Sequence, residues 1–339
     1  MKISAMAFVV FISGGLAFPA AAGQTFDSVK SKGYVQCGVN SDVPGFGFLD
    51  SRGVFHGLDV DLCRAIAAAV LGSAEKIRTT ALTAQQRFTA LQSGEVDVLV
   101  RNTTATLMRD VSLGLAAAGV NFYDGQGFMV AKKLGVKSAL ELNGATICVA
   151  PGTTTELNLT DYFRAHQMQF TPVVIEKTEE VDAGFFSGRC DVLTTDASQL
   201  ASVRATLAPR PDDYVILPER ISKEPLGPFV RQGDQQWFNI VKWTLMAMIE
   251  AEELGINQKN VDEMAKSTNP AIQRVLGVTP EFGKALGLDE KWAYNIIKQV
   301  GNYGDSFERN VGEESKIGLE RGLNDLWTHG GLMYALPMR

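Results

Sequence analysis

The chain has 339 residues, of which 45% are hydrophobic and 21% charged, and its net charge is -6. This composition is typical of a globular protein and excludes a disordered chain. The acidic balance argues against a nucleic-acid partner, because phosphate binding needs a basic surface. At about 100–200 residues per domain, the length indicates two domains.

Residues 1–22 are typical of a signal peptide. Lys2 supplies a positive start, Ala5 to Phe18 is apolar, and small residues precede a cleavage site near Ala22. An uncleaved membrane anchor is the alternative, but the apolar stretch is short, and no cysteine follows it to carry a lipid. No later stretch approaches the roughly 18 apolar residues of a membrane span. We therefore expect an exported, soluble protein.

Strand and helix signals alternate after this segment. YVQCGV at 34–39 predicts a strand, and the following residues predict a hairpin-like excursion that turns at Gly53. A helix should begin near Asp59 or Asp61 and end before Gly72. KIRTTAL predicts a second strand, and TAQQRFTALQSGEVDVLV predicts a helix and a third strand. This order predicts a mostly parallel sheet flanked by helices.

The same order restarts near Ala145, with ATICVAPGTTTELNLTDYFRAH, FTPVVIEK and TEEVDAGFFSGRCDVLTTDASQL. FYDGQGFMV and VILPERISKEPLGPFVRQG follow the two units, and their extended character predicts two crossings. We therefore expect an α/β protein of two lobes, each a mostly parallel sheet flanked by helices, joined by two hinge crossings. The expected division is 23–123 plus 228–339 for lobe 1 with a C-terminal helical extension, 127–220 for lobe 2, and hinges about 124–126 and 221–227.

The four cysteines are Cys37, Cys63, Cys148 and Cys190. Export favours disulfides, and four cysteines allow three pairings. We favour Cys37 with Cys63 and Cys148 with Cys190, because each bond then stays within one lobe and leaves the lobes free to move. A zinc site is the alternative. No pair has Cys-x-x-Cys spacing and the three histidines are scattered, so we expect no metal.

Hydroxyl-rich turns follow strands in both units, where ligands of open α/β sheets bind. RNTTATLMR follows Val100, PGTTTE follows Val149, and TTDAS carries Asp196. Arg109 can hold a carboxylate through two parallel bonds, and the amides that open the helix after Gly152 favour an anion. Asp196 can accept from an ammonium group. This set suits a zwitterion such as a free α-amino acid.

Each signal also has a purely structural interpretation. The PGTTTE turn could be only a helix cap with Glu156 as the capping-box partner. Arg109 could form an exposed ion pair with Asp110, and Asp196 could cap the helix that begins ASQL. The placement of these signals at matching strand ends in two units favours a binding site.

The ordered motifs resemble the periplasmic amino-acid-binding proteins of ABC importers, solute-binding protein family 3, over nearly all of the chain after the signal segment. The resemblance is carried by GLDVDLCRAIAA, RFTALQSGEVDVLV, RNTTATLMRD, PGTTTE and GRCDVLTTD. YDGQGFMV, ISKEPLGPFVRQGD and GNYGDSFERNVG are most similar to the general L-amino-acid-binding group. The resemblance implies the two-lobed periplasmic-binding-protein fold, a periplasmic location, a free L-amino acid as ligand and an ABC permease as partner. It also implies a monomer that needs no cofactor and is not an enzyme.

The resemblance assigns roles to residues of both lobes. Arg109 matches the arginine that clamps the α-carboxylate, and Asp196 matches the acid that takes the α-ammonium. The first lobe adds Thr104 with Asn102 before it. The second lobe adds Thr154, which matches the residue whose amide and hydroxyl bind the α-carboxylate, with Thr153 beside it.

The side-chain end of the expected pocket departs from narrow-specificity relatives. Ala84 stands where such relatives place an aromatic ring against the ligand, and Asn40 stands where binders of cationic ligands carry an acid. We expect Asn40, Asp42, Phe46 and Ala84 to line a roomy end, which predicts broad specificity.

Two other functions remain open at this point. Cyclohexadienyl dehydratases resemble the same fold, although the sequence shows no acid–base pair beyond Asp196, and His166 lies on an expected helix surface. A ligand-binding partner of a chemoreceptor is the other alternative. No role follows from the sequence for the tail beyond about Asn257.

Overall fold

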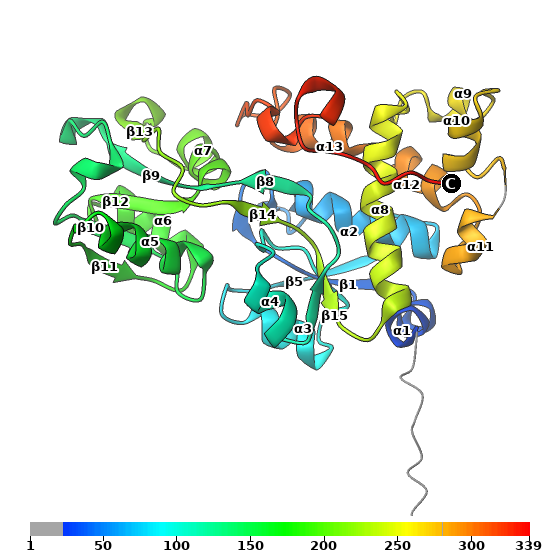
Figure 1. Cartoon of the computed structure of the whole chain (residues 1–339), viewed down its shortest axis with the longest axis horizontal. Coiled ribbons are helices and arrows are strands. Elements are labelled where there is room, and N and C mark those ends of the chain that lie inside the picture. Colours follow the sequence, from blue (N-terminus) through cyan, green and yellow to red (C-terminus); the bar gives the residue numbers. More distant parts are fainter. Residues whose placement is uncertain (1–22, 280) are drawn as a thin grey trace, which may run out of the picture.

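A computed structural model describes residues 23–279 and 281–339 of the chain. The predicted signal peptide lies outside the described residues. Two five-stranded sheets form the centres of two lobes, which lie side by side along the longest axis of the molecule in Figure 1. The two-lobed α/β fold expected from the sequence is therefore confirmed.

The first lobe is built on a sheet of order β5-β1-β6-β15-β7. Its strands are β5 (Ile77–Ala81), β1 (Val35–Val39), β6 (Val98–Leu99), β15 (Phe229–Arg231) and β7 (Leu115–Ala117). β1 pairs in parallel with β5 and β6, whereas β15 runs antiparallel to β6 and β7. The helices of this part are α1 (Gln24–Lys32), α2 (Leu58–Leu71), α3 (Arg87–Ser93) and α4 (Leu107–Ser112).

The second lobe repeats this plan with the sheet order β11-β10-β12-β9-β13. Its strands are β11 (Thr171–Val174), β10 (Thr146–Val149), β12 (Val192–Asp196), β9 (Gln126–Ala131) and β13 (Tyr214–Ile216). Its helices are α5 (Thr154–Ala165), α6 (Thr178–Phe186) and α7 (Ala197–Thr206), with 3-10 turns at Lys132–Leu134, Ala139–Glu141 and Pro211–Asp213. One strand of each sheet, β15 or β9, runs against the other four, so both sheets are mostly parallel as expected.

Two extended segments cross between the lobes. β8 (Phe122–Asp124) and β14 (Glu224–Leu226) pair antiparallel, with Glu224 opposite Asp124. They run together through the middle of the view in Figure 1. Because both crossings lie in one narrow ribbon, it is the natural axis for relative rotation of the lobes.

The sequence between β1 and α2 forms the expected excursion as a small meander. Its strands are β2 (Asp42–Val43), β3 (Gly47–Leu49) and β4 (Phe55–His56), with Gly53 in the turn at a φ of 80°. Asp42 and Pro44 at its base touch the second lobe, because they accept hydrogen bonds from Glu179 N and Ser202 Oγ at 3.2 and 2.6 Å. The meander therefore forms part of the cleft wall.

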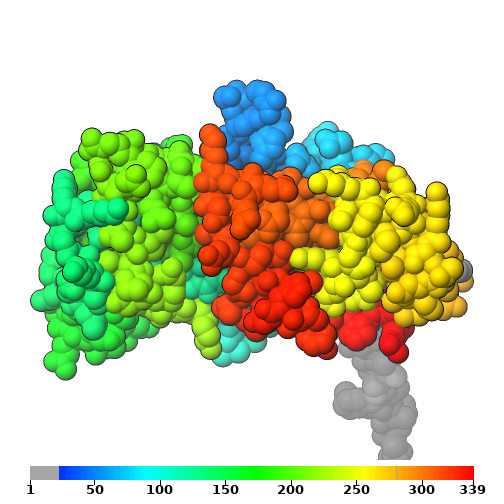
Figure 2. Space-filling view, turned by 90° about the horizontal axis from the view of Figure 1, so that it is seen from above, coloured from blue at the N-terminus to red at the C-terminus, as the bar shows by residue number. Residues whose placement is uncertain are grey.

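The tail after residue 234 folds onto the first lobe. It contains α8 (Gln235–Glu253), α9 (Val261–Met264), α10 (Pro270–Val275), α11 (Phe282–Leu286), α12 (Trp292–Gln299) and α13 (Tyr303–Asn310), followed by 3-10 turns at Gly322–Asn324 and Trp327–His329. Trp237, Trp292 and Phe307 are fully or almost fully buried in the same core as α2. In Figure 2 the yellow, orange and red segments form one continuous surface that extends to the green second lobe. The tail is thus part of the first lobe's core.

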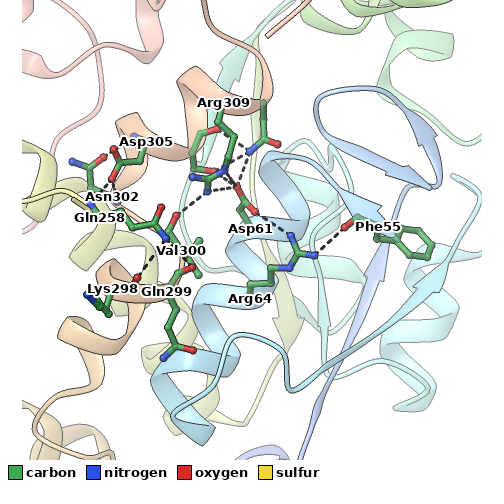
Figure 3. A network of polar contacts seen from close by, with 12 residues as sticks. Phe55, Asp61, Arg64, Gln258, Lys298, Gln299, Val300, Asn302, Asp305 and Arg309 are labelled. Atoms are coloured by element: carbon green, nitrogen blue, oxygen red, sulfur yellow. Dashed lines mark hydrogen bonds and ion pairs between the residues drawn. The ribbon is translucent and has the colours of Figure 1, made fainter. Parts of the chain in front are cut away.

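A buried carboxylate ties α13 to α2. Asp61 Oδ2 accepts hydrogen bonds from Ser306 Oγ at 2.8 Å, from Arg309 Nη2 at 2.6 Å and from Asn310 Nδ2 at 2.6 Å. Arg64 Nη1 lies 3.6 Å from the other oxygen. Figure 3 shows how these side chains converge on Asp61. Since this carboxylate is 4% exposed, its partners must replace the water that solvates it in the unfolded chain.

Both disulfides favoured from the sequence are present, one in each lobe. Cys37 on β1 bonds to Cys63 on α2, with Cα atoms 6.3 Å apart. Cys148 on β10 bonds to Cys190 just before β12, with Cα atoms 5.7 Å apart. Neither bond spans the hinge, so neither limits movement of the lobes. Among the described residues, no helix combines the length and the apolar character needed to cross a membrane.

Candidate functional site

A cavity lies between the lobes, beyond the carboxyl ends of β1, β10 and β12. It has about 630 Å³ of empty volume, mouth included. The first lobe contributes Asn40, Val43, Ala84, Arg87, Arg101, Asn102 and Thr104 to its lining. The second lobe contributes Ala150, Thr153, Thr154, Thr155, Thr178, Val181, Asp182, Leu193, Thr194, Thr195, Asp196 and Gln199. Five of the six residues predicted to bind the ligand backbone are therefore brought together, and Arg109 lies outside this lining.

The loop after β6 is held in an unusual backbone conformation. Asn102 has a φ of 40°, a left-handed geometry that asparagine tolerates better than most residues. Its backbone N–H donates to Asp59 Oδ2 at 2.9 Å, and Asn121 Nδ2 donates to Asp59 Oδ1 at 3.0 Å. Burial raises the pKa of Asp59 to about 6, against the effect of these hydrogen bonds. Asp59 thus fixes the turn that presents Thr104 to the cavity.

Thr104 meets the second lobe through a carboxylate on the hinge. The Thr104 and Thr154 hydroxyls donate to Glu224 Oε2 at 2.6 and 2.8 Å. Asn158 Nδ2 and Ser222 Oγ donate to the other oxygen at 2.8 and 2.6 Å. Glu224 is 1% exposed, so its carboxyl group is shielded from water and held by four donors from both lobes and the hinge.

Arg109 contacts the same loop. It lies on α4, is 8% exposed, and its Nη1 donates to the carbonyl oxygen of Thr104 at 2.9 Å. Its guanidinium carbon is 5.1 Å from the centre of the Phe88 ring. Burial lowers its pKa, while Glu224 and then Asp196 act in the opposite direction. Arg109 and Asp196 therefore act on the same region of the cleft, and no exposed pair with Asp110 is present.

The second-lobe turn after β10 opens α5 as a capped helix. Thr153 Oγ1 accepts from Glu156 N at 3.1 Å, and Glu156 Oε2 accepts from Gly152 N at 2.9 Å. The capping interpretation of this turn is therefore correct for the hydroxyl of Thr153. The hydroxyl of the next residue, Thr154, reaches across the cleft. The same turn therefore caps α5 and contributes to the site.

Asp196 ends β12 and is the N-cap residue of α7, yet its side chain makes no cap hydrogen bond. It is 7% exposed and lines the cavity. Burial, together with Asp124 and Glu224, raises its pKa well above the ordinary value, and Arg87 and Arg109 oppose this shift. A carboxylate in this position gains from an added cation, because a cation would offset both the desolvation and the repulsion.

Two buried arginines line the cavity that the sequence analysis did not select. Arg87 on α3 is 3% exposed, its Nε has no partner, and its Nη2 lies 3.4 Å from Gly152 O across the cleft. Arg101 Nε donates to Leu82 O at 2.6 Å, and burial lowers its pKa to about 10. Arg87 lies in the helix predicted from TAQQRFTALQSG, and Arg101 is the first residue of the hydroxyl-rich RNTTATLMR turn. The position of Arg101 in that turn is the sequence signal that could have identified it.

Two acids were also missed, Asp182 on α6 and Glu224 on β14. Asp182 is 3% exposed, and neither of its carboxyl oxygens has a hydrogen-bond partner. Burial first, and then Asp42, raises its pKa to about 8. An acid within a helical pattern is usually solvated, so EEVDAGFF gave no sign of this position.

The expected lining of the side-chain end is only partly found. Asn40 and Ala84 line the cavity, but Phe46 and Asp42 do not. Phe46 is fully buried in the first lobe's core, where its ring packs edge-on against Phe122 with centroids 5.1 Å apart. Asp42 lines an adjoining hollow that shares Arg101 and Thr178 with the main cavity. The placement of Phe46 is corrected because the tight β2–β3 turn directs this ring into the core.

The lobes touch across the cleft in several places. The Thr104 and Thr154 hydroxyl oxygens are 3.3 Å apart, and Thr83 Oγ1 donates to Glu176 Oε1 at 3.0 Å. With the contacts of Asp42 and Pro44, they show a closed arrangement. No group of histidine, cysteine and acidic side chains in the described residues is suited to a metal ion.

Residues 35–262 match the model of the bacterial extracellular solute-binding proteins, family 3. The general L-amino acid-binding periplasmic protein AapJ of Rhizobium johnstonii is 58% identical over 94% of both chains. The glutamate/glutamine/aspartate/asparagine-binding protein BztA of Rhodobacter capsulatus is 56% identical over 94% of this chain and 95% of its own.

A solved structure of an ABC transporter periplasmic binding protein from Brucella ovis with glutathione bound has a TM-score of 0.91. It is 56% identical and covers 93% of this chain and 99% of its own. These similar proteins are binding proteins, which confirms the prediction of a solute-binding protein rather than an enzyme.

Proposed function

The chain belongs to the bacterial extracellular solute-binding proteins, family 3, and on that premise we propose that it serves an amino-acid ABC importer. It captures free L-amino acids with varied side chains in the cleft between its lobes and delivers them to the membrane permease. The observation that carries this proposal is a cavity whose walls supply charges of both signs and buried polar atoms without partners. Such atoms are costly in an empty site, and a polar ligand satisfies them.

The α-ammonium group of the ligand binds beside Asp196. The Thr104 and Thr154 hydroxyl protons are directed to Glu224, so their oxygens retain lone pairs for the ligand. An ammonium group has three donors, which match one carboxylate and two hydroxyl oxygens. This assignment gives Thr154 a role at the cationic pole, whereas the sequence analysis placed it at the carboxylate.

The α-carboxylate binds at the arginine side of the cleft. Arg109 uses one nitrogen on Thr104 O and retains other N–H groups for a ligand anion. Free amides at the start of α5 face the same region, and a helix N-terminus favours negative charge. Arg87, whose Nε has no partner, adds a second guanidinium to this pole.

Closure of the lobes selects for the complete zwitterion. The first lobe offers Arg109 and Thr104, and the second offers Thr154 and Asp196. Only the closed state presents both sets, so a ligand that binds both stabilises that state. The permease then distinguishes the closed shape from the open one.

The cellular setting follows from the family and the N-terminal sequence. We propose that the chain loses its signal peptide near Ala22 and acts in the periplasm as a monomer. The two disulfides suit this compartment, because disulfides form and persist in the oxidising periplasm. The permease of an amino-acid ABC transporter is the protein partner.

Calorimetry with blocked ligands tests the proposal. Glutamine is titrated into the protein beside N-acetylglutamine and glutamine α-amide, which each lack one charged pole. Binding of glutamine near micromolar, about -8 kcal/mol, is expected, with at least a hundredfold loss for either blocked form. Equal binding of the free and blocked compounds would contradict the proposal.

A further inference from the structure

One end of the cavity carries polar groups that the binding of the two charged poles leaves unused. Asp182 on α6 is 3% exposed, and both of its carboxyl oxygens lack a partner among the described residues. On the opposite lobe, Asn40 at the end of β1 is 2% exposed, and its Oδ1 also lacks a partner in this part of the chain. Asn40 Nδ2 donates to Asn102 Oδ1 at 2.7 Å, which leaves Asn102 Nδ2 as an unpaired donor.

These groups lie away from the pole-binding end, which is the end of the cavity that binds the α-ammonium and α-carboxylate groups. Asp196 lies opposite Gln126 on β9, two residues after the end of the hinge strand β8. Asp182 lies on α6, which packs against β2, and Asn40 stands two residues before β2. The two cavity acids therefore belong to different ends, one at the hinge and one at the β2 meander.

We propose that Asp182 and Asn40 form a subsite for the side-chain carboxamide of a bound amino acid. The inference rests on the amino-acid-binding function proposed above. A primary carboxamide has two N–H donors and one carbonyl acceptor. Asp182 and Asn40 Oδ1 accept from its nitrogen, and Asn102 Nδ2 donates to its oxygen. Glutamine and asparagine are then preferred within an otherwise broad ligand range.

Other side-chain classes satisfy these groups less well. An aliphatic side chain buries Asp182 without a partner, which is costly for a carboxyl group. A cationic side chain has donors only, so it leaves Asn102 Nδ2 without an acceptor. A carboxylate side chain has acceptors only, so it leaves Asn40 Oδ1 without a donor. A carboxamide avoids all three costs, because it is neutral and carries both donors and an acceptor.

Calorimetry on Asp182→Leu, with glutamine and alanine as the two ligands, tests the inference. Alanine has both poles but no side chain that reaches the subsite, so its affinity reports on the fold and on the pole-binding end. We expect Asp182→Leu to weaken glutamine at least tenfold and to change alanine less than twofold. Asp182→Asn, which keeps one acceptor oxygen, should fall between the wild type and Asp182→Leu for glutamine.

The control is Glu180→Gln, an exposed residue on the same helix that pairs only with Lys177. It should change neither ligand. Equal losses for glutamine and alanine in Asp182→Leu, or no loss for glutamine, would overturn the subsite. If the wild-type protein binds neither amino acid, the proposed function itself is wrong. This outcome differs from the two results for Asp182→Leu that would overturn only the subsite.

Discussion

The hydroxyl oxygens of Thr104 and Thr154 lie 3.3 Å apart, although Thr104 belongs to the first lobe and Thr154 to the second. Both donate to Glu224 Oε2 on the crossing strand β14. A single hinge carboxylate therefore holds one group from each wall of the cleft. Because these bonds exist only when the walls meet, Glu224 links ligand-site geometry to lobe closure.

Replacing Glu224 with glutamine tests this link. The amide keeps the size of the side chain but loses the charge and one acceptor oxygen. Either the two threonine hydroxyls or the Asn158 and Ser222 side chains then lose the oxygen to which they donate. Hydrogen bonds to charged groups contribute about 1.5–3 kcal/mol, so affinity for every amino acid should fall about tenfold or more. Calorimetry measures the change.

The control is Glu141→Gln, at an exposed site in the second lobe. Unchanged binding in Glu224→Gln would show that Glu224 does not link the ligand site to lobe closure.

Arg109→Lys should weaken binding of all amino acids alike. Lysine keeps the charge but cannot donate to Thr104 O and to a ligand carboxylate with the same planar group. We expect a loss of about 2–3 kcal/mol, which is roughly a hundredfold in Kd. The matched control is Arg164→Lys, whose side chain is 78% exposed. A loss of affinity that varies with the ligand side chain would contradict the assignment of Arg109 to the α-carboxylate.

The ligand-free protein should lose stability as pH rises, in part because of Asp182. Burial raises the pKa of this carboxyl from 3.8 to about 8, so the folded chain holds a proton that the unfolded chain has released. Its contribution is complete below pH about 4 and declines until pH about 8, because the unfolded state binds fewer protons across this range.

Asp182→Asn removes this loss of stability at high pH, because an amide does not titrate. The Tm of the variant should exceed that of the wild type by several degrees at pH 8, and the difference should shrink toward pH 4. Thermal denaturation across this range, with exposed Glu180→Gln as the control, measures it. A Tm difference that is constant with pH would contradict the assignment.

Asp61→Asn should destabilise the fold without touching the cleft. An amide that keeps its oxygen at the Oδ2 position still accepts from Ser306, Arg309 and Asn310. It loses the charge that pairs with Arg309, and its N–H groups then face the Arg64 guanidinium. Breaking a buried charged network costs about 3–5 kcal/mol, and the attachment of α13 should weaken first. Asp262→Asn is the control, because its pair with Lys298 is exposed and contributes at most about 1 kcal/mol. Equal Tm changes for the two variants would show that the Asp61 network is not stabilising.

The sequence predicts the fold well because the fold depends on local patterns. Both mostly parallel sheets are indicated by apolar strand segments, by glycines at helix ends such as Gly72 and Gly94, and by the repeated Asp-Val-Leu strands. The hydroxyl-rich turns at strand ends likewise predict Thr104 and Thr154, because parallel strands place these turns at one edge.

The buried charges are harder to predict because their roles depend on tertiary contacts. Asp182 and Arg87 lie in helices, and the sequence pattern of these helices does not show that both side chains are buried. Glu224 lies in a crossing strand that gives no sign of meeting two threonines. The prediction for Phe46 is wrong for the same reason, because the sequence does not show which way the three-residue turn between β2 and β3 directs the ring.

The most direct test of the central claim is a crystal structure of the protein with glutamine bound. We expect the ligand in the cleft, with its α-ammonium within hydrogen-bond distance of Asp196 and its α-carboxylate on the side of Arg109. A ligand outside the cleft, or one whose ammonium group faces Arg109 instead, would contradict the account.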